Sequence, residues 1–343
     1  MSSLSKHLYS TTIDDVAKRA GVSISTVSRV INQTTPVSQE IVSRVQAAMM
    51  ELHYVPRTAA RNLASRKTNT LGLMLTEIQG DFFVPMLSGI EAVASEAGLD
   101  LLISTSGRRQ ARPHQEIPLS VGVHNADGLL IFANSLSETD LAHCYNLGLP
   151  IVLIYQASPA SLEIPCVTIE NKAASRNMVN HLIEVHGCRR IAFLRGPERN
   201  DDSYWREIGY REALAAHDIP FDPNLIAQGD FDRKLVEAAV KKMLAAGVEM
   251  DAIFSGDDEG AIAVLDVLKE AGRRVPEEIA VVGFDDLRLS AYLTPPLTTV
   301  RAPTEKVGYE AAQQLVKLIR TGQADSLTLL PTEIVIRRSC GCA

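Results

Sequence analysis

The sequence has no long apolar run. No segment approaches the roughly 20 consecutive apolar residues that a transmembrane helix needs. The first residues also lack the apolar core of a secretory signal peptide, so we expect a cytoplasmic protein with no membrane partner. Cysteine is scarce, with five in 343 residues, and this odd, scattered set argues against a disulfide framework and for a reducing compartment.

Common catalytic motifs are also missing. The sequence contains no G-x-G-x-x-G, no G-x-x-x-x-G-K-[ST], no G-x-S-x-G and no H-E-x-x-H. No nucleophile can be paired with a base, so we expect no enzyme, no cofactor and no bound metal. His181 and His186 do not share a helix face, and we interpret both as surface histidines. Cys340 and Cys342 are interpreted as free thiols, with a metal site or a strained bridge as the alternatives.

An excess of positive charge is missing from the chain as a whole, whose formal net charge is −7. Taken alone, this balance argues against nucleic-acid binding. Residues 1–67 hold nine of the 34 basic residues but only four of the 41 acidic ones. The rest of the chain therefore has 25 basic and 37 acidic residues. A basic head on an acidic body is typical of a nucleic-acid-binding domain joined to a domain with another task.

The basic head begins with two predicted helices around Gly21. Apolar residues at helical spacing predict one helix over 13–20 and a second over 24–32. The second helix carries on its other face Ile24, Ser25, Ser28, Arg29 and Asn32. Two helices packed across a glycine turn, the second with a polar face, are the parts of a helix-turn-helix.

Two residues are predicted to cap helices of this head. Thr12 precedes the first helix, and Asp15 follows at the spacing of a capping box. Ser38 is placed to cap a third helix that ends near Leu52. We expect a three-helix unit, preceded by a disordered segment over residues 1–11.

The segment after Pro56, residues 57–65, has good helix formers but no hydrophobic face. An isolated helix this short is marginally stable in water, so it should be ordered only when it docks against a partner. A plain basic linker is the simpler interpretation. Its small residues, its arginines and the single projecting Leu63 favour a hinge that folds on DNA.

From Thr70 onward, short apolar strands alternate with helices, which predicts an α/β fold with parallel sheets. Some 270 residues of this pattern exceed one sheet, so we expect two lobes. Strands are expected at 70–76, 101–105, 127–133, 151–155, 190–194, 252–255, 279–283 and 332–337. Helices are expected at 84–98, 138–147, 172–186, 203–217, 234–246, 259–271 and 304–320.

Several polar and aromatic residues of this body follow predicted strands or begin helices, at the edge where open α/β sheets bind ligands. They are Phe82, Phe83, Arg206, Phe231, Asp257 and Asp285. Aromatic faces stack on sugar rings or bases, whereas carboxylates and arginine form hydrogen bonds with hydroxyl groups. We expect a cleft for a small ligand.

Five blocks of the sequence, in order, resemble the lac repressor (LacI/GalR) family of bacterial transcription regulators. They are T-I-D-D-V-A-K-R-A-G-V-S-I-S-T-V-S-R-V-I-N, V-S-Q-E-I-V-S-R-V, E-L-H-Y-V-P-R-T-A-A-R-N-L-A, V-V-G-F-D-D and P-P-L-T-T-V. The resemblance spans nearly everything from Thr12 to Arg338. It implies a three-helix helix-turn-helix head and a two-lobed body like that of periplasmic binding proteins.

The resemblance also implies which residues contact DNA. Ile24 and Ser25, the first two positions of the recognition helix, would set base preference together with Arg29, a natural bidentate partner of guanine. Leu63 would wedge into the minor groove beside Ala60 and kink the duplex. Further contacts to the DNA would come from Thr12, Ser23, Thr26, Ser28, Asn32, Tyr54 and Arg57.

Effector contacts are implied for Arg206, Phe231, Asp257 and Asp285. Many members of the family have Asp-Arg where this chain has Tyr155-Gln156, so we expect a small effector, a saccharide, in a pose of its own. The implied domains are a helix-turn-helix over 12–56, a hinge helix or linker over 57–68 and an effector-binding and dimerisation domain over 69–343. The lobes of that last domain are expected at about 69–168 with 301–331, and at about 169–300 with 332–343.

The predicted function is therefore a transcriptional regulator, a repressor, in the bacterial cytoplasm. It would bind palindromic operator DNA as a homodimer or tetramer and be switched by a saccharide in the cleft. One alternative is the same family with a purine or a phosphoprotein corepressor as the effector. Another is a small-molecule-binding protein without a regulatory role.

Overall fold

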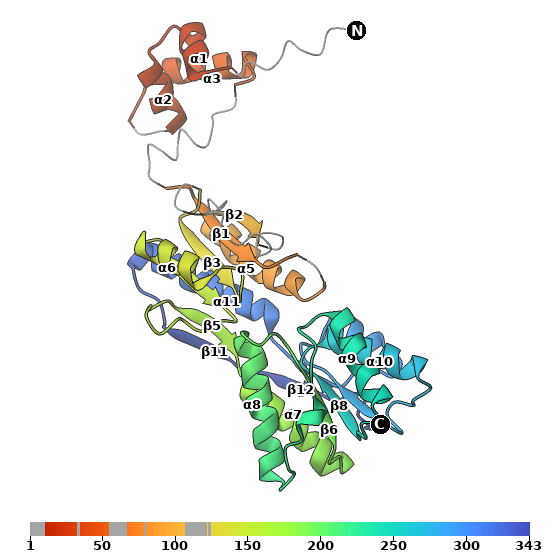
Figure 1. The fold of residues 1–343 in the computed structure, drawn as a ribbon. Coiled ribbons are helices and arrows are strands. Elements are labelled where there is room, and N and C mark those ends of the chain that lie inside the picture. Colours follow the sequence, from red (N-terminus) through yellow and green to blue (C-terminus); the bar gives the residue numbers. More distant parts are fainter. Residues whose placement is uncertain (1–10, 33–34, 55–66, 79, 107–121, 123–124) are drawn as a thin grey trace, which may run out of the picture. The chain divides into compact units, whose positions relative to one another are not determined.

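The computed structural model describes residues 11–32, 35–54, 67–78, 80–106, 122 and 125–343. The chain divides into two compact units, Met1–Thr68 and Asn69–Ala343, and each is described by itself (Figure 1). The disorder expected before residue 11 and the hinge expected at 57–65 lie outside the described residues. Among the described residues, no helix has the length and apolarity needed to cross a membrane.

The first unit contains the three expected helices, α1 (Ile13–Ala20), α2 (Ile24–Asn32) and α3 (Gln39–Glu51). Each contributes a valine to their common core, since Val16, Val27 and Val45 are fully buried. These apolar residues hold the two helices of the helix-turn-helix against α3.

The turn and the caps define where these helices begin and end. Gly21 ends α1 in the left-handed region at φ 64°, which glycine adopts at little cost. The predicted capping box is confirmed, because the Asp15 amide donates to the Thr12 hydroxyl at 3.3 Å and the Thr12 amide donates to Asp15 Oδ2 at 2.9 Å. The predicted cap at Ser38 is wrong in its chemistry: Ser38 stands at the N-cap of α3, but its side chain makes no capping hydrogen bond.

The first lobe of the second unit is built on a parallel sheet with helices on both faces. Its strand order is β11-β5-β4-β3-β1-β2. Neighbouring residues of β1 face opposite layers: Leu73 packs in a cluster with Ile90, and Met74 packs in another with Leu141. The elements are β1 (Thr70–Leu75), α5 (Phe83–Ala97), β2 (Asp100–Thr105), β3 (Gly128–Phe132), α6 (Glu138–Asn146), β4 (Ile151–Ile154), β5 (Cys166–Ile169), α11 (Thr304–Thr321) and β11 (Leu327–Leu330).

The second lobe has a smaller parallel sheet of order β7-β6-β8-β9 and an antiparallel pair, β10 with β12. Phe193 of β6 packs toward α7 and α8, while the flanking Leu194 packs toward α9 and α10. The elements are α7 (Asn171–His186), β6 (Ile191–Arg195), α8 (Asp201–Ala216), η2 (Pro223–Leu225), β7 (Ile226–Gln228), α9 (Arg233–Ala245), β8 (Ala252–Ser255), α10 (Asp258–Glu270), β9 (Ala280–Val282), η3 (Arg288–Tyr292), β10 (Thr299–Arg301) and β12 (Glu333–Val335).

The chain passes between the two lobes after β5, after β10 and after β11. The alternating pattern and the parallel sheets were predicted, but β5, β7, β10 and β11 were not. These strands have only three or four residues, and so do β4, β8, β9 and β12, which were predicted; at this length periodicity gives no signal, and only a neighbouring apolar run can mark a strand. The predicted closing strand is present as β12, which pairs antiparallel to β10.

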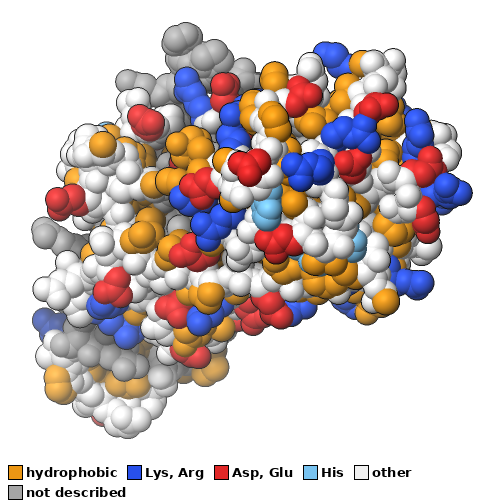
Figure 2. All heavy atoms as spheres, turned by 90° about the horizontal axis from the view of Figure 1, so that it is seen from below, with side chains coloured by type: hydrophobic (Ala, Val, Ile, Leu, Met, Phe, Trp, Pro, Cys, Tyr) orange, Lys and Arg blue, Asp and Glu red, His pale blue; other side chains and the backbone are white. Residues whose placement is uncertain are grey.

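On the face drawn in Figure 2, acidic and basic side chains are intermixed, without a large area of one sign.

Helices α5 and α11 lie side by side in the first lobe, in contact through their backbones (Figure 1). A β-carbon added at Gly89 would lie 2.1 Å from the Glu305 carbonyl oxygen. One added at Gly308 would lie 2.1 Å from the Met86 carbonyl oxygen. Only glycine fits at these two positions.

Gly89→Ala should therefore lower the free energy of unfolding of the body by about 2 kcal/mol or more, because the added methyl group pushes α11 away. Ser88→Ala is the matched control: Ser88 is exposed on the same helix, and its replacement should change stability by less than about 0.5 kcal/mol. Chemical denaturation measures both variants. Equal stabilities would show that the two helices are not in backbone contact.

Candidate functional site

The exposed face of α2 carries the residues expected to read bases. Ile24 is 47% exposed, and Ser25 and Arg29 are exposed as well. Arg29 has no ion-pair partner among the described residues, so its guanidinium is available to a ligand. An arginine and a small apolar side chain on one exposed helical face suit the major groove of DNA.

Three hydroxyl groups gather where α2 begins. The Ser23 Oγ lies 2.8 Å from both the Ser25 Oγ and the Thr26 Oγ1, and it accepts a hydrogen bond from the Thr26 amide at 3.2 Å. This serine therefore caps the helix, at the end where the helix dipole is positive. Hydroxyl and amide donors at a helix N-terminus form a natural site for a phosphate group.

The other residues expected at DNA are less uniform. Thr12 is exposed, but its hydroxyl is engaged with Asp15. Ser28 is half-buried, and so is Tyr54, which packs against the core of the head. Asn32 is the last residue of α2. Arg57, Ala60 and Leu63 lie outside the described residues.

In the first lobe, Phe82 and Phe83 belong to an aromatic cluster. The Phe82 ring lies 5.4 Å from that of Phe83, 6.2 Å from Phe132 and 5.8 Å from Tyr155. Phe83 is buried in the core, whereas Phe82 is half-buried and lines a groove. Tyr155 is the fourth member of this cluster, and its backbone has a positive φ of 57°. From the sequence it was noted only as a departure from the family pattern.

The second lobe presents a buried cation, Arg206, on α8. Its Nε donates to Asn171 Oδ1 at 2.9 Å, and its Nη1 donates to the Gly256 carbonyl. Its Nη2 lies 3.8 Å from Asp285 Oδ1 and 3.9 Å from Asp202 Oδ2. A guanidinium this deeply buried is held by charge and hydrogen bonds together.

Aromatic rings enclose the same guanidinium. Its Cζ lies 3.6 Å from the centre of the Phe284 ring and 5.7 Å from that of Phe231. Phe231 has φ 56°, and its ring covers Gly196, where an added β-carbon would come within 2.1 Å of it. Such a left-handed conformation at a large residue is strained and is common at ligand sites. Four of the six predicted effector residues, Arg206, Phe231, Asp257 and Asp285, thus lie close together, with the Arg206 guanidinium among them.

Three carboxyl groups near Arg206 are protonated more readily than usual. Burial raises the pKa of Asp202 and of Asp257 to about 6, although Arg206 opposes the shift. Burial also raises the pKa of Asp285 well above its ordinary value. The Oδ1 of Asp285 and the hydroxyl of Tyr155 have no hydrogen-bond partner among the described residues. Unsatisfied buried polar atoms fit hydrogen bonds to a bound ligand.

A groove of about 700 Å³ lies within the second unit, and of the residues around Arg206 only Asp285 lines it. Asp81, Phe82 and Thr304 line it from the first lobe, and Asp285 and Arg301 line it near the crossing after β10. Its size suits a small ligand.

Asn171 and Asp202 were missed by sequence reasoning. Asn171 donates to Asp202 Oδ1 at 2.7 Å and accepts from Arg206, so it joins the two charged groups. Asn171 follows β5, one of the four strands that were not predicted. Without that strand, Asn171 could not be recognised as a residue at the end of a strand.

The interpretation of His181 and His186 as separate surface histidines is wrong. Their ring centres are 5.1 Å apart, both side chains are half-buried, and both approach Cys342. His186 is the last residue of α7, and the C-terminal turn of the chain brings Cys340 and Cys342 to this helix end. A tertiary contact of this kind leaves no trace in helical spacing.

Both parts of the chain are similar to known proteins. The family described as "Bacterial regulatory proteins, lacI family" matches residues 12–57, and "Periplasmic binding protein-like domain" matches residues 179–340. The HTH-type transcriptional regulator CelR of Thermobifida fusca is 34% identical over 96% of this chain and 98% of its own length. Catabolite control protein A of Priestia megaterium is 31% identical over 96% and 98%.

Solved structures have a similar fold over nearly the whole chain. A CelR–cellobiose complex has a TM-score of 0.69 at 32% identity, covering 96% of this chain and 99% of that one. The lac repressor dimer bound to operator and the anti-inducer ONPF has a TM-score of 0.79 at 25% identity, covering 97% and 99%.

A helix-turn-helix head joined to a two-lobed α/β body with a buried charged cluster around Arg206 is typical of a DNA-binding transcriptional regulator. The chain belongs to the lacI family of bacterial regulatory proteins. The predicted family, fold class and regulatory function are confirmed. The relatives are transcriptional regulators.

The raised pKa of Asp257 predicts a pH-dependent stability. The folded state holds this proton more tightly than the unfolded state, so the contribution is present below pH 3.8 and is lost as pH rises through about 6. Asp257→Asn removes the titration but keeps an acceptor for the Gly260 amide, which Asp257 now caps at 3.2 Å. The stability of the wild type relative to this variant should fall by about 2 kcal/mol from pH 4 to pH 7.5. Urea denaturation across that range measures it, and parallel curves would contradict the prediction.

Proposed function

We propose that this regulator is a repressor that binds a palindromic operator as a homodimer and is switched by a small saccharide in the cleft beside Arg206. The exposed Ile24, Ser25 and Arg29 support a base-reading role for α2. The lac repressor relative is a dimer bound to operator, which supports the dimeric state.

The nature of the cleft supports a saccharide. A sugar ring has an apolar face for Phe82 and Phe231, and its hydroxyl groups suit Asp285 Oδ1 and the Tyr155 hydroxyl, which have no hydrogen-bond partner among the described residues. A relative binds cellobiose, which is of this chemical class. We also infer that the chain is not an enzyme, because its buried carboxyls surround an arginine rather than a nucleophile.

The proposal assigns roles along the chain. The helix-turn-helix spans 12–56, the hinge 57–68 and the effector-binding body 69–343. Residues 69–168 with 301–331 make one lobe, and 169–300 with 332–343 make the other. Contacts to the DNA backbone are assigned to Thr12, Ser23, Thr26, Ser28, Asn32, Tyr54 and Arg57, and the minor-groove wedge to Leu63 beside Ala60. A ligand that favours one lobe arrangement would change DNA affinity by population shift.

Arg29→Ala should lower discrimination between the operator and a duplex with one substituted guanine by about 1–3 kcal/mol. Fluorescence anisotropy of the full chain on a palindrome from its own upstream region measures this at fixed salt. Arg19→Ala is the matched control. It removes a basic side chain that is paired with Glu51, and it should weaken binding to both duplexes alike. Equal discrimination in Arg29→Ala and the wild type would refute the assigned role.

Thermal-shift screening of sugars and nucleobases should return a saccharide that raises the melting temperature of the wild type. Asp285→Asn keeps the shape of the side chain but removes its charge, so it should weaken binding of that saccharide by roughly 10-fold or more. Glu270→Gln, at the far end of the same helix, changes an exposed carboxylate that pairs with Lys241; it is the control and should bind normally. If a nucleobase were the only compound that raised the melting temperature, the effector would be a nucleobase and not a saccharide. If Asp285→Asn bound the saccharide as tightly as the wild type, the saccharide would not bind at Asp285.

A further inference from the structure

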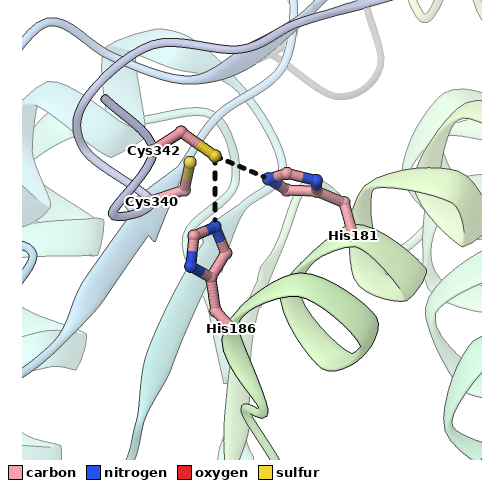
Figure 3. A group of neighbouring side chains, drawn as sticks. All are labelled: His181, His186, Cys340 and Cys342. Atoms are coloured by element: carbon pink, nitrogen blue, oxygen red, sulfur yellow. Dashed lines mark hydrogen bonds between the residues drawn. The ribbon is translucent and has the colours of Figure 1, made fainter.

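Two histidines and two cysteines from opposite parts of the second unit converge at the end of α7 (Figure 3). One ligand atom from each of His181, His186, Cys340 and Cys342 lies within 4.8 Å of all the others. Both imidazoles direct Nε2 toward Cys342 Sγ, at 3.7 Å from His181 and 3.4 Å from His186. Four soft or borderline donors therefore face a common point.

The backbone that carries the two cysteines is fixed to the second lobe. Ser339 is fully buried, donates from its hydroxyl to the Val281 carbonyl at 2.6 Å and accepts from the Thr298 amide at 2.8 Å. Cys340 is 2% exposed, and its sulfur accepts a hydrogen bond from the Thr298 hydroxyl at 3.1 Å. The cysteines are thus held by the sheet, independently of α7.

Gly341 allows the chain to turn around His186. Its φ of 107° lies in the region that favours glycine, and an added β-carbon would lie 3.2 Å from His186 Nδ1. The turn is closed by a hydrogen bond from the Gly341 amide to the Arg338 carbonyl at 3.1 Å. A glycine between the two thiols lets both sulfurs face the histidines.

These distances match a tetrahedral metal site. With Zn–S near 2.3 Å and Zn–N near 2.0 Å, two ligand atoms of a tetrahedral zinc ion are about 3.3–3.8 Å apart. The distances from Cys342 Sγ to the two Nε2 atoms fall within that range, and the whole set, within 4.8 Å, needs to contract by about 1 Å at most when the ion binds. We propose that His181, His186, Cys340 and Cys342 bind one zinc ion that fastens the C-terminal turn to α7.

The donor set determines the metal and its role. Two thiolates and two imidazoles in a tetrahedron select zinc over magnesium or calcium, which prefer oxygen. Four protein ligands leave no open position for a reacting water, so the site is structural. Each ligating thiol releases its proton to solvent when the ion binds. The Thr298 hydroxyl, directed at Cys340, would stabilise the thiolate from outside the coordination sphere.

The test is zinc binding by the full chain, purified with a phosphine reductant, dialysed against a chelator and titrated with zinc against a chromophoric competitor. The wild type should bind one zinc per chain. Cys342→Ser and His181→Asn change half-exposed side chains and should each lower the affinity by more than about 100-fold, beyond the effect of losing an outer-sphere partner. Cys144→Ala removes a buried thiol of the first lobe and should bind like the wild type.

Two further measurements separate loss of the site from loss of the fold. Cobalt in place of zinc should give the visible absorption of a tetrahedral thiolate site in the wild type and not in Cys342→Ser. Zinc should raise the melting temperature of the wild type by a few degrees, whereas in chelator Cys342→Ser and His181→Asn should melt close to the wild type. The proposal would be overturned if the fully reduced wild type bound less than one zinc per chain. It would also be overturned if Cys342→Ser bound zinc with the affinity of the wild type.

Discussion

The body depends on one buried charge. Arg206 is 4% exposed, and a guanidinium in that position must be surrounded by acceptors, which Asn171, Asp202, Asp285 and the Gly256 carbonyl supply. These acceptors lie where strands end or helices begin, so one side chain brings several segments to one place. The charges do not balance: three carboxyls with raised pKa surround a single cation. A ligand that donates hydrogen bonds to them relieves that excess.

This imbalance links the cleft to the proposed regulation. Asp285 Oδ1 has the Arg206 guanidinium at 3.8 Å but accepts no hydrogen bond from a described residue, and the buried Tyr155 hydroxyl has no hydrogen-bond partner among them; a bound hydroxyl group would satisfy such atoms. A ligand with differential affinity for two lobe arrangements shifts their populations, and this shift changes the affinity for DNA when the two arrangements also differ in their affinity for DNA. In the head, Val16, Val27 and Val45 pack α2 against α1 and α3, so the helix face that we propose to read bases is held in place by the core of the head itself.

Periodic features of the fold were predictable, and tertiary contacts were not. The helices of the head, the Thr12 capping box and the alternating strands follow from spacing and capping chemistry that act locally. Four strands of three or four residues escaped, and Asn171 was missed with β5. Arg206, Phe231 and Asp285 were named, but their convergence depends on packing. The His181–Cys342 contact joins residues 161 positions apart, which no local pattern encodes.

The central claim is that the cleft controls the reading face, and one measurement tests it directly. Anisotropy of operator binding by the full chain is recorded with and without the saccharide identified by thermal shift, in the wild type and in Asp285→Asn. We expect the saccharide to change the operator dissociation constant of the wild type by about 5-fold or more. In Asp285→Asn the same concentration should change it little. A saccharide that binds the wild type yet leaves operator affinity unchanged would contradict the account.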